Sequence, residues 1–230
     1  MFFIIIFGKV IMTKNIHYKE FKKTGLIKYI TIDHLKKALE NIEKTTKKNE
    51  QEEAKALLIT LYYTGCRPAE ALLMKSKQIE KKGTHLKLLF VTLKGGRART
   101  IWLSTKKFPL LRILYEWHLK KYHEEYLFFN FMGKYKHKRE WFHKRENKLV
   151  NKEYIDLSAK LPYYFKKWFK GIVEINPYYL RHNKFSKLAN DPQVTDRDLM
   201  QLKGARSYDS IEFYIHQSAQ RAKKLSTKGG

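Results

Sequence analysis

The spacing of hydrophobic residues changes along this chain from the period of helices to the period of strands, and then back again. Before position 78, apolar residues recur three and four positions apart, as in the set Leu35, Ala38, Leu39 and Ile42. Residues 78–80, 86–91 and 99–103 instead have the length and composition of short strands. Helical spacing returns from about residue 108. The pattern therefore predicts an α+β fold that is mostly α-helical and contains three short strands.

Capping residues mark where several of these helices begin and end. Thr31 predicts the start of a helix through about residue 44, and Gly65 predicts the end of the next helix. Asn176 followed by Pro177 predicts the start of a helix to about residue 188. Thr195 and Asp198 form a capping-box sequence before a short helix that stops at Gly204. Further helices are expected over residues 68–75, 108–128 and 152–170, and from 207 or 209 through Tyr214, whereas 44–53 reads as a loop.

The charge of the chain favours a polyanionic partner. It contains 48 Lys and Arg against 22 Asp and Glu, a formal net charge of +26. A field of this sign suits nucleic acid first and an anionic membrane surface second, with a generic basic surface as the remaining alternative. The hydrophobic content of 43% excludes a disordered chain, which lacks the apolar residues to form a core.

Residues 134–148 form the densest basic segment. Seven Lys and Arg stand there against two acids, with Trp141 and Phe142 between them. Mixed basic and aromatic residues suit a phosphate-lined surface, although a solvated loop explains the composition equally well. The predicted DNA contacts in this segment are Lys136, Lys138, Arg139, Lys144 and Arg145.

Other features narrow the class of protein. The apolar run over residues 2–7 is too short to span a bilayer, which needs about 20 residues. Residues 1–30 read as an N-terminal arm, and Met12 is an alternative start. Cys66 is the only cysteine, which is compatible with a reducing cytoplasm, and the nine histidines show no zinc-binding pattern. We therefore expect a cytoplasmic protein with no membrane association, metal or small-molecule cofactor.

Two arginines stand close to predicted helix starts. Arg67 directly precedes Pro68, and Arg181 lies one turn after Pro177. Helix N-termini present free N–H groups and the positive end of the helix dipole, so they attract phosphate, and an arginine adds a bidentate donor. On spacing alone, each arginine could equally be an ordinary surface charge.

The order of four motifs is more specific, and it resembles the tyrosine recombinases, the group of lambda integrase and the Xer proteins. The segment TGCRPAE over residues 64–70 resembles the family's TGxRxxE box, and LKGGRAR over 93–99 is similar to its lysine-bearing hairpin. The segment NPYYLRH over 176–182 resembles the TPHxLRH box. Gly204 and the later YIH of 214–216 resemble its LGH…YTH ending.

The resemblance implies a fold, a reaction and a set of site residues. It implies a three-stranded antiparallel sheet in a mostly helical catalytic domain over residues 31–216. It also implies cleavage and rejoining of duplex DNA through a 3′-phosphotyrosyl bond to Tyr214. Arg67 and Arg181 would stabilise the phosphate, and Lys94 would be the general acid. Glu70 would orient Arg67, unless it is an ordinary surface carboxylate, and His182, Arg97 and Arg99 would support the site or contact DNA.

Two positions depart from the family pattern. Tyr178 stands where the TPHxLRH box has histidine, and Ala205 stands where the family often has histidine or tryptophan. Tyr178 would then hydrogen-bond the phosphate, while Lys203 and Arg206, which flank Ala205, would supply the missing donor. Such substitutions resemble those of divergent integrases from archaeal viruses and mobile elements. Tyr208 is the alternative nucleophile, although its spacing from Gly204 does not fit.

The remaining expectations concern the whole protein. Thirty residues cannot form the core-binding domain that usually precedes the catalytic domain, so none is expected here. Residues 217–230 form a basic tail with Ala219, Ala222 and Leu225 at helical spacing, and family resemblance implies self-association as a tetramer on DNA. A catalytically silent DNA-binding relative and a type IB topoisomerase-like relaxing enzyme remain alternatives.

Overall fold

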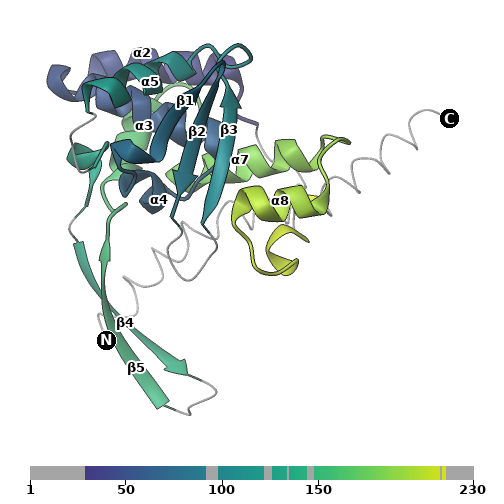
Figure 1. The fold of residues 1–230 in the computed structure, drawn as a ribbon. Helices are drawn as coiled ribbons and strands as arrows, with labels where there is room; N and C mark the ends of the chain where they lie inside the picture. The colour runs from purple at the N-terminus through teal and green to yellow at the C-terminus, as the bar shows by residue number, and fades with distance from the viewer. Residues whose placement is uncertain are drawn as a thin grey trace.

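The computed structural model describes residues 29–91, 98–121, 126–133, 135–143, 148–212 and 214–215. Helices pack against one face of a small sheet, and a long two-stranded hairpin projects from the body (Figure 1). Lys94, Arg97, Lys144, Arg145, the N-terminal arm before residue 29 and the tail after 215 lie outside the described residues. Within the described residues, no helix is long and apolar enough to cross a membrane.

Helix α3 (Gln51–Thr64) forms the centre of the main core. Its alanines and leucines are buried on almost every side, and it packs against α2 (Ile32–Thr45), α5 (Leu111–Lys120) and α7 (Pro177–Ala189). The predicted caps are confirmed at both ends of this region. Thr31 accepts a hydrogen bond from the His34 backbone at the start of α2, and Gly65 ends α3 in the left-handed conformation.

The predicted three-stranded antiparallel sheet is confirmed, with the order β1 (Ile79–Lys82), β2 (His85–Phe90) and β3 (Arg99–Ser104). Burial alternates along β2 and β3, so that one face of the sheet packs on the core. In Figure 1 the strands run from the α2–α5 end of the body toward α4 (Pro68–Leu72).

Two predicted helices are shorter than expected. The helix expected over 68–75 is α4, which ends at Leu72, and the short 3₁₀ helix η2 (Ser76–Gln78) leads into β1. The helix expected over 108–128 ends at Lys120, because the backbone of the segment after it forms hydrogen bonds with other parts of the chain. The Leu127 N–H donates to the Met74 carbonyl, and the Leu127 carbonyl accepts from the Trp117 indole. Residues 129–131 form the 3₁₀ helix η3 (Phe129–Phe131).

The basic segment is a hairpin and not a loop. Strand β4 (Tyr135–His143) pairs antiparallel with β5 (Lys148–Asp156), and both extend away from the body (Figure 1). The helix expected over 152–170 is therefore wrong in its first part. It begins only at α6 (Leu161–Trp168), because residues up to Asp156 pair with β4.

The C-terminal helices form a second, smaller core. Asn176 caps α7 and Pro177 is its first residue, while the Thr195–Asp198 capping box begins α8 (Asp196–Lys203), which Gly204 ends. These predictions are confirmed. Residues 209–212 and 214–215 are helical, and Tyr214 packs there with Phe185, Leu199 and Ile211.

Candidate active site

The first arginine of the site lies in the sharp connection between α3 and α4. Gly65 has a φ of +60°, which favours glycine, and the chain then turns so that Arg67 precedes the first residue of α4. A Cβ at Gly65 would lie 2.9 Å from the Lys184 Cβ on α7. The connection is therefore packed tightly against the helix that carries the second arginine.

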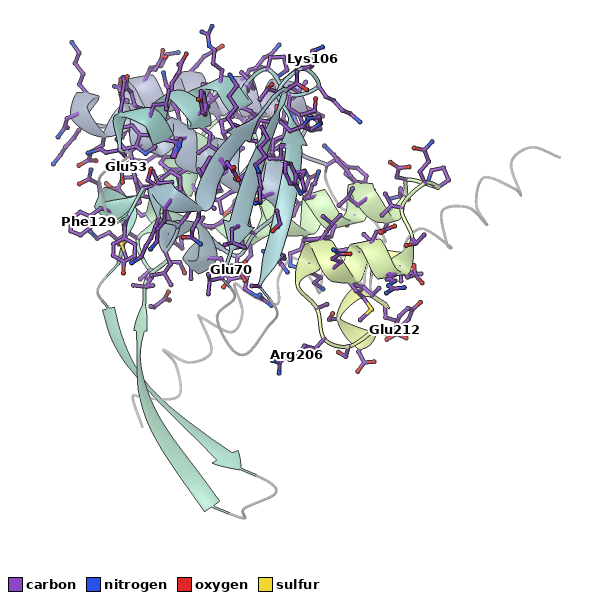
Figure 2. The ribbon with its side chains drawn as sticks, in the orientation of Figure 1. Glu53, Glu70, Lys106, Phe129, Arg206 and Glu212 are labelled. Atoms are coloured by element: carbon purple, nitrogen blue, oxygen red, sulfur yellow. The ribbon has the colours of Figure 1, made fainter. Side chains whose placement is uncertain are left out.

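Glu70 joins Arg67 to the sheet. Its buried carboxylate accepts hydrogen bonds from the Arg67 backbone N–H at 2.8 Å, from Arg67 Nη1 at 2.6 Å and from Arg99 Nη2 at 2.7 Å. Burial alone raises the pKa of Glu70, but the hydrogen bond and charge of Arg99, with the bonds from Arg67, hold that pKa below its ordinary value. Glu70 is thus an ionised anchor for Arg67, and the alternative of a surface carboxylate is wrong. Figure 2 shows Glu70 near one end of the sheet, with Lys106 near the other end.

The structure corrects the role expected of Arg99. Its side chain is only 2% exposed, so it does not offer the open surface of a DNA contact. The reason is the period of β3, which places Arg99 on the same buried face as Ile101 and Leu103. Among the described residues, its Nε and Nη1 find no hydrogen-bond partner. The pairing of Arg99 with Glu70 was missed at the sequence level, although the two-residue spacing to Ile101 was the available signal.

Arg181 lies on α7 and is almost completely buried. Its Nη1 donates to the Gly65 carbonyl at 2.6 Å and its Nη2 donates to the Lys203 carbonyl at 2.9 Å. Burial and the charge of Arg67 lower the pKa of Arg181 to about 10, so the guanidinium is still charged at neutral pH. Arg181 therefore ties together the α3–α4 connection and the end of α8, close to Arg67.

Tyr214 lies beside Arg181 with its ring in the second core. Its hydroxyl oxygen is 2.9 Å from Nδ1 of His182, which is the residue after Arg181 on α7. Burial raises the pKa of Tyr214 to about 12, against a smaller effect of the Arg181 charge. The phenol is thus neutral at physiological pH and is paired with a group that can accept its proton.

Lys203 completes a group of three cations. Its Nζ donates to the Ser210 carbonyl and lies 4.7 Å from the centre of the Tyr214 ring. Burial, with the charges of Arg181 and Arg67, lowers the pKa of Lys203 to about 8. Because these cations disfavour one another, the site is electrostatically prepared for an anion.

The other expected residues lie around this group. Tyr178, in the first turn of α7, is 41% exposed, and burial of its hydroxyl and the nearby carboxylate of Asp156 raise its pKa against the effect of Arg67. Arg206 is exposed and points away from the body (Figure 2). Tyr208 is also exposed, and its hydroxyl donates to Asp196 at 3.1 Å, away from the arginines. The structure therefore brings Arg67, Arg181, Lys203, His182 and Tyr214 together and leaves Tyr208 outside.

Comparison with known proteins decides the family. The model of the phage integrase family matches residues 28–221, which include all of these side chains. The chain belongs to the phage integrase family. No curated protein sequence matches this phage integrase family member closely enough to serve as a relative.

Solved structures show the same fold at low sequence identity. The XerH site-specific recombinase bound to palindromic difH substrate in a post-cleavage complex has a TM-score of 0.60 and 19% identity over 86% of this chain and 52% of that one. The XerA recombinase has a TM-score of 0.57 and 16% identity over 89% and 65%. The Tn1549 transposon integrase in complex with circular intermediate DNA has a TM-score of 0.51 and 13% identity over 86% and 67%. This phage integrase family member thus has the fold of a tyrosine-recombinase catalytic domain and spans about half the length of XerH.

Proposed function

We propose that this protein is a site-specific DNA recombinase that cleaves and rejoins duplex DNA through a covalent bond to Tyr214. The observation that carries the proposal is the position of Tyr214, whose ring centre lies 4.7 Å from the Lys203 Nζ and whose phenol feels the charge of Arg181, which in turn lies near Arg67. Burial and neighbouring positive charges lower the pKa values of Arg181 and Lys203, and a phosphodiester bound beside the phenol would relieve this repulsion.

In this proposal the Tyr214 oxygen attacks the scissile phosphorus. A bond forms between the phenol oxygen and phosphorus, the bond from phosphorus to the 5′-oxygen breaks, and the DNA 3′ end stays attached to the protein. The phosphate ester bond is exchanged and not lost, so a 5′-hydroxyl of the same or another strand can reverse the step and rejoin the DNA.

The two arginines would bind the phosphate as donors that are already held in place, and Lys203 would add a third positive charge. Arg181 is held by two carbonyls, and Arg67 is held by Glu70, so both guanidinium groups are oriented before DNA arrives. Preorganised donors stabilise a transition state because they need no reorganisation during the reaction. Lys203 takes the place of the donor missing at Ala205, and Tyr178 offers a hydroxyl at the exposed edge.

Two protons must move. The hydrogen bond between Tyr214 and His182 makes His182 the acceptor of the phenol proton, provided that Nδ1 is unprotonated when the tyrosine attacks. The leaving 5′-oxygen needs a proton, and we assign its donation to Lys94, on the basis of the family hairpin motif. Lys94 lies outside the described residues, so its assignment rests on the sequence.

The proposal is tested by covalent capture. A pool of random-sequence duplexes, each with a nick that lets the short cleaved fragment diffuse away, is incubated with the protein, and adducts are isolated on a denaturing gel. We expect an adduct whose DNA maps to Tyr214 by mass spectrometry. Tyr214→Phe removes one hydroxyl and should abolish the adduct while DNA binding stays close to normal.

Tyr208→Phe is the matched control, because it removes the same hydroxyl from a tyrosine outside the arginine cluster. It should form the adduct as the unaltered protein does. Failure of the unaltered protein to form any adduct, with DNA binding intact, would favour a catalytically silent DNA-binding relative. An adduct that persists in Tyr214→Phe and disappears in Tyr208→Phe would move the nucleophile to Tyr208.

A further inference from the structure

The backbone pairing of the β4–β5 hairpin divides its residues between two faces. Residues directly opposite each other in an antiparallel pair lie on the same face, and successive residues alternate between faces. Arg139 pairs with Lys152, and Lys138 pairs with Glu153. The odd-numbered residues of β4 and even-numbered residues of β5 therefore form one face, here named the Arg139 face. The remaining strand residues form the Lys138 face.

The two faces differ in charge and composition. The Arg139 face has three Lys and Arg residues and one carboxylate, together with two histidines, two tyrosines, Trp141 and Val150. The Lys138 face has two lysines and two glutamates, which balance, and three apolar residues. The net positive charge of the two strands is thus concentrated on a single face.

The cross-strand pairs differ in the same way. Lys138 stands opposite Glu153, and opposite charges in this position stabilise a pair of strands. Arg139 stands opposite Lys152, and like charges in this position destabilise one. An anion bound across Arg139 and Lys152 would convert that repulsion into attraction, so the pairing indicates a negatively charged partner for this face.

The root of the hairpin lies beside the proposed active site. Asp156 is the last residue of β5 and belongs to the Arg139 face, and its carboxylate is close enough to raise the pKa of Tyr178. The root is also fixed, because the Gly133 N–H donates to the Leu157 carbonyl at 2.7 Å. A Cβ at Gly133 would lie 2.8 Å from the Asp156 carbonyl. A duplex whose phosphate occupies the arginine cluster would therefore pass close to the start of the hairpin.

We propose that the Arg139 face of the β4–β5 hairpin binds duplex DNA next to the cleavage site, with Arg139 and Lys152 gripping the phosphate backbone. This inference rests on the proposed function, because the active site defines where the DNA runs. A two-stranded ribbon fits the major groove of B-DNA, which is about 12 Å wide. Strands of nine residues reach about 30 Å, a length comparable with one turn of the duplex. The proposal separates Arg139 from Lys136 and Lys138, which belong to the opposite face.

The test compares two double variants that each remove two positive charges from the hairpin. Arg139→Ala with Lys152→Ala changes the Arg139 face, and Lys136→Ala with Lys138→Ala changes the Lys138 face. Binding of a fluorescein-labelled duplex of mixed sequence is followed by anisotropy over a series of salt concentrations. We expect the slope of log affinity against log salt to decrease in magnitude by about 1.8 for the first variant, which loses two phosphate contacts, and to stay unchanged for the second.

Two further variants keep the result independent of folding. Arg139→Lys with Lys152→Arg preserves both charges and should bind as the unaltered protein does. Arg139→Glu creates an opposite-charge pair with Lys152, so it should leave the melting temperature equal or higher while it weakens DNA binding.

Equal losses in the two double alanine variants, or a larger loss in the Lys136 and Lys138 variant, would overturn the face assignment. If the two double alanine variants show equal or reversed losses while the Tyr214 adduct still forms, only this inference fails. The absence of any adduct is the separate failure of the proposed function.

Discussion

Among the single side chains of the proposed active site, His182 is the one whose contact points most directly to proton transfer. It lies on α7 directly after Arg181, and its Nδ1 is 2.9 Å from the Tyr214 hydroxyl. Burial raises the pKa of Tyr214 to about 12, so very little phenolate forms at neutral pH without a base. A neighbouring base therefore has a direct effect on the rate of attack.

We predict that His182→Ala slows covalent adduct formation by about 10²- to 10⁴-fold, the range typical for loss of a general base. DNA affinity should change little, because His182 is not one of the three cations proposed to bind the phosphate. Single-turnover formation of the adduct, measured beside equilibrium binding, separates the two effects. An unchanged rate of adduct formation would show that the phenol proton leaves by another route.

Lys203 predicts a dependence of DNA binding on pH. The pKa of Lys203 in the free protein is about 8, below its ordinary value, and a bound phosphate would raise it again. Its contribution to affinity should therefore be complete below pH 8 and should be lost as the pH rises through the higher pKa of the complex. Anisotropy titrations from about pH 7 to about pH 9.5 should show this decline. Lys203→Arg stays charged and should bind with a flatter profile, and an identical decline in that variant would assign the effect to another group.

At the scale of elements, the ion pairs of Glu70 connect α4 with β3. Arg99, on the strand that follows the Lys94 motif, donates a hydrogen bond to Glu70, and Arg67 donates to the other carboxylate oxygen of Glu70. We predict that Arg99→Met destabilises the fold by about 3 kcal/mol, because it leaves part of a buried carboxylate without its partner. Chemical unfolding measures this loss, and the adduct assay measures the accompanying loss of activity.

The double variant Arg99→Met with Glu70→Met distinguishes support of the fold from positioning of the site. Replacing both charges of a buried pair by apolar groups often restores stability. We expect the double variant to recover most of the unfolding free energy but not the adduct, because replacing Glu70 removes the carboxylate that anchors Arg67. Recovery of both the unfolding free energy and the adduct would show that Glu70 and Arg99 support only the fold.

The elements differ in how well the sequence predicted them. Helices with local start and stop signals, such as those capped by Thr31, Asn176 and Thr195, were predicted almost to the residue. The errors occurred where distant contacts decide the structure. Leu127 leaves the helical path because it bonds to Met74 and Trp117, and residues up to Asp156 are extended because β4 lies beside them.

The same distinction applies to the site. Motif order was enough to select Arg67, Arg181 and Tyr214, which the fold brings together. It was not enough to find the bond between His182 and Tyr214, which lie 32 positions apart, or the burial of Arg99. Lys94 and Arg97 stay predictions, because they lie outside the described residues. Side-chain partners across elements depend on packing that local sequence does not encode.

At the scale of the whole molecule, the proposed rejoining of two DNA sites would require several protomers. The tail over residues 217–230 lies outside the described residues, and its apolar stripe of Ala219, Ala222 and Leu225 makes it a candidate for docking on a neighbouring copy. We predict that deleting the residues after Gln217 reduces strand exchange between two sites more than it reduces binding to one site. Recombination assays and gel shifts on the same preparation measure the two quantities. A truncated protein that recombines as well as the full chain would exclude docking between protomers.

Gly65 has a consequence for how the site tolerates substitution. Its carbonyl holds Arg181, its backbone conformation directs the chain toward Arg67, and it has no room for a side chain beside Lys184. Shortening Lys184 to alanine would leave its Cβ 2.9 Å away, and no change on α7 relieves the left-handed backbone, so a substitution at position 65 meets both costs. A side chain at position 65 would therefore disturb both arginines at once, because the same residue holds Arg181 and leads the chain into Arg67.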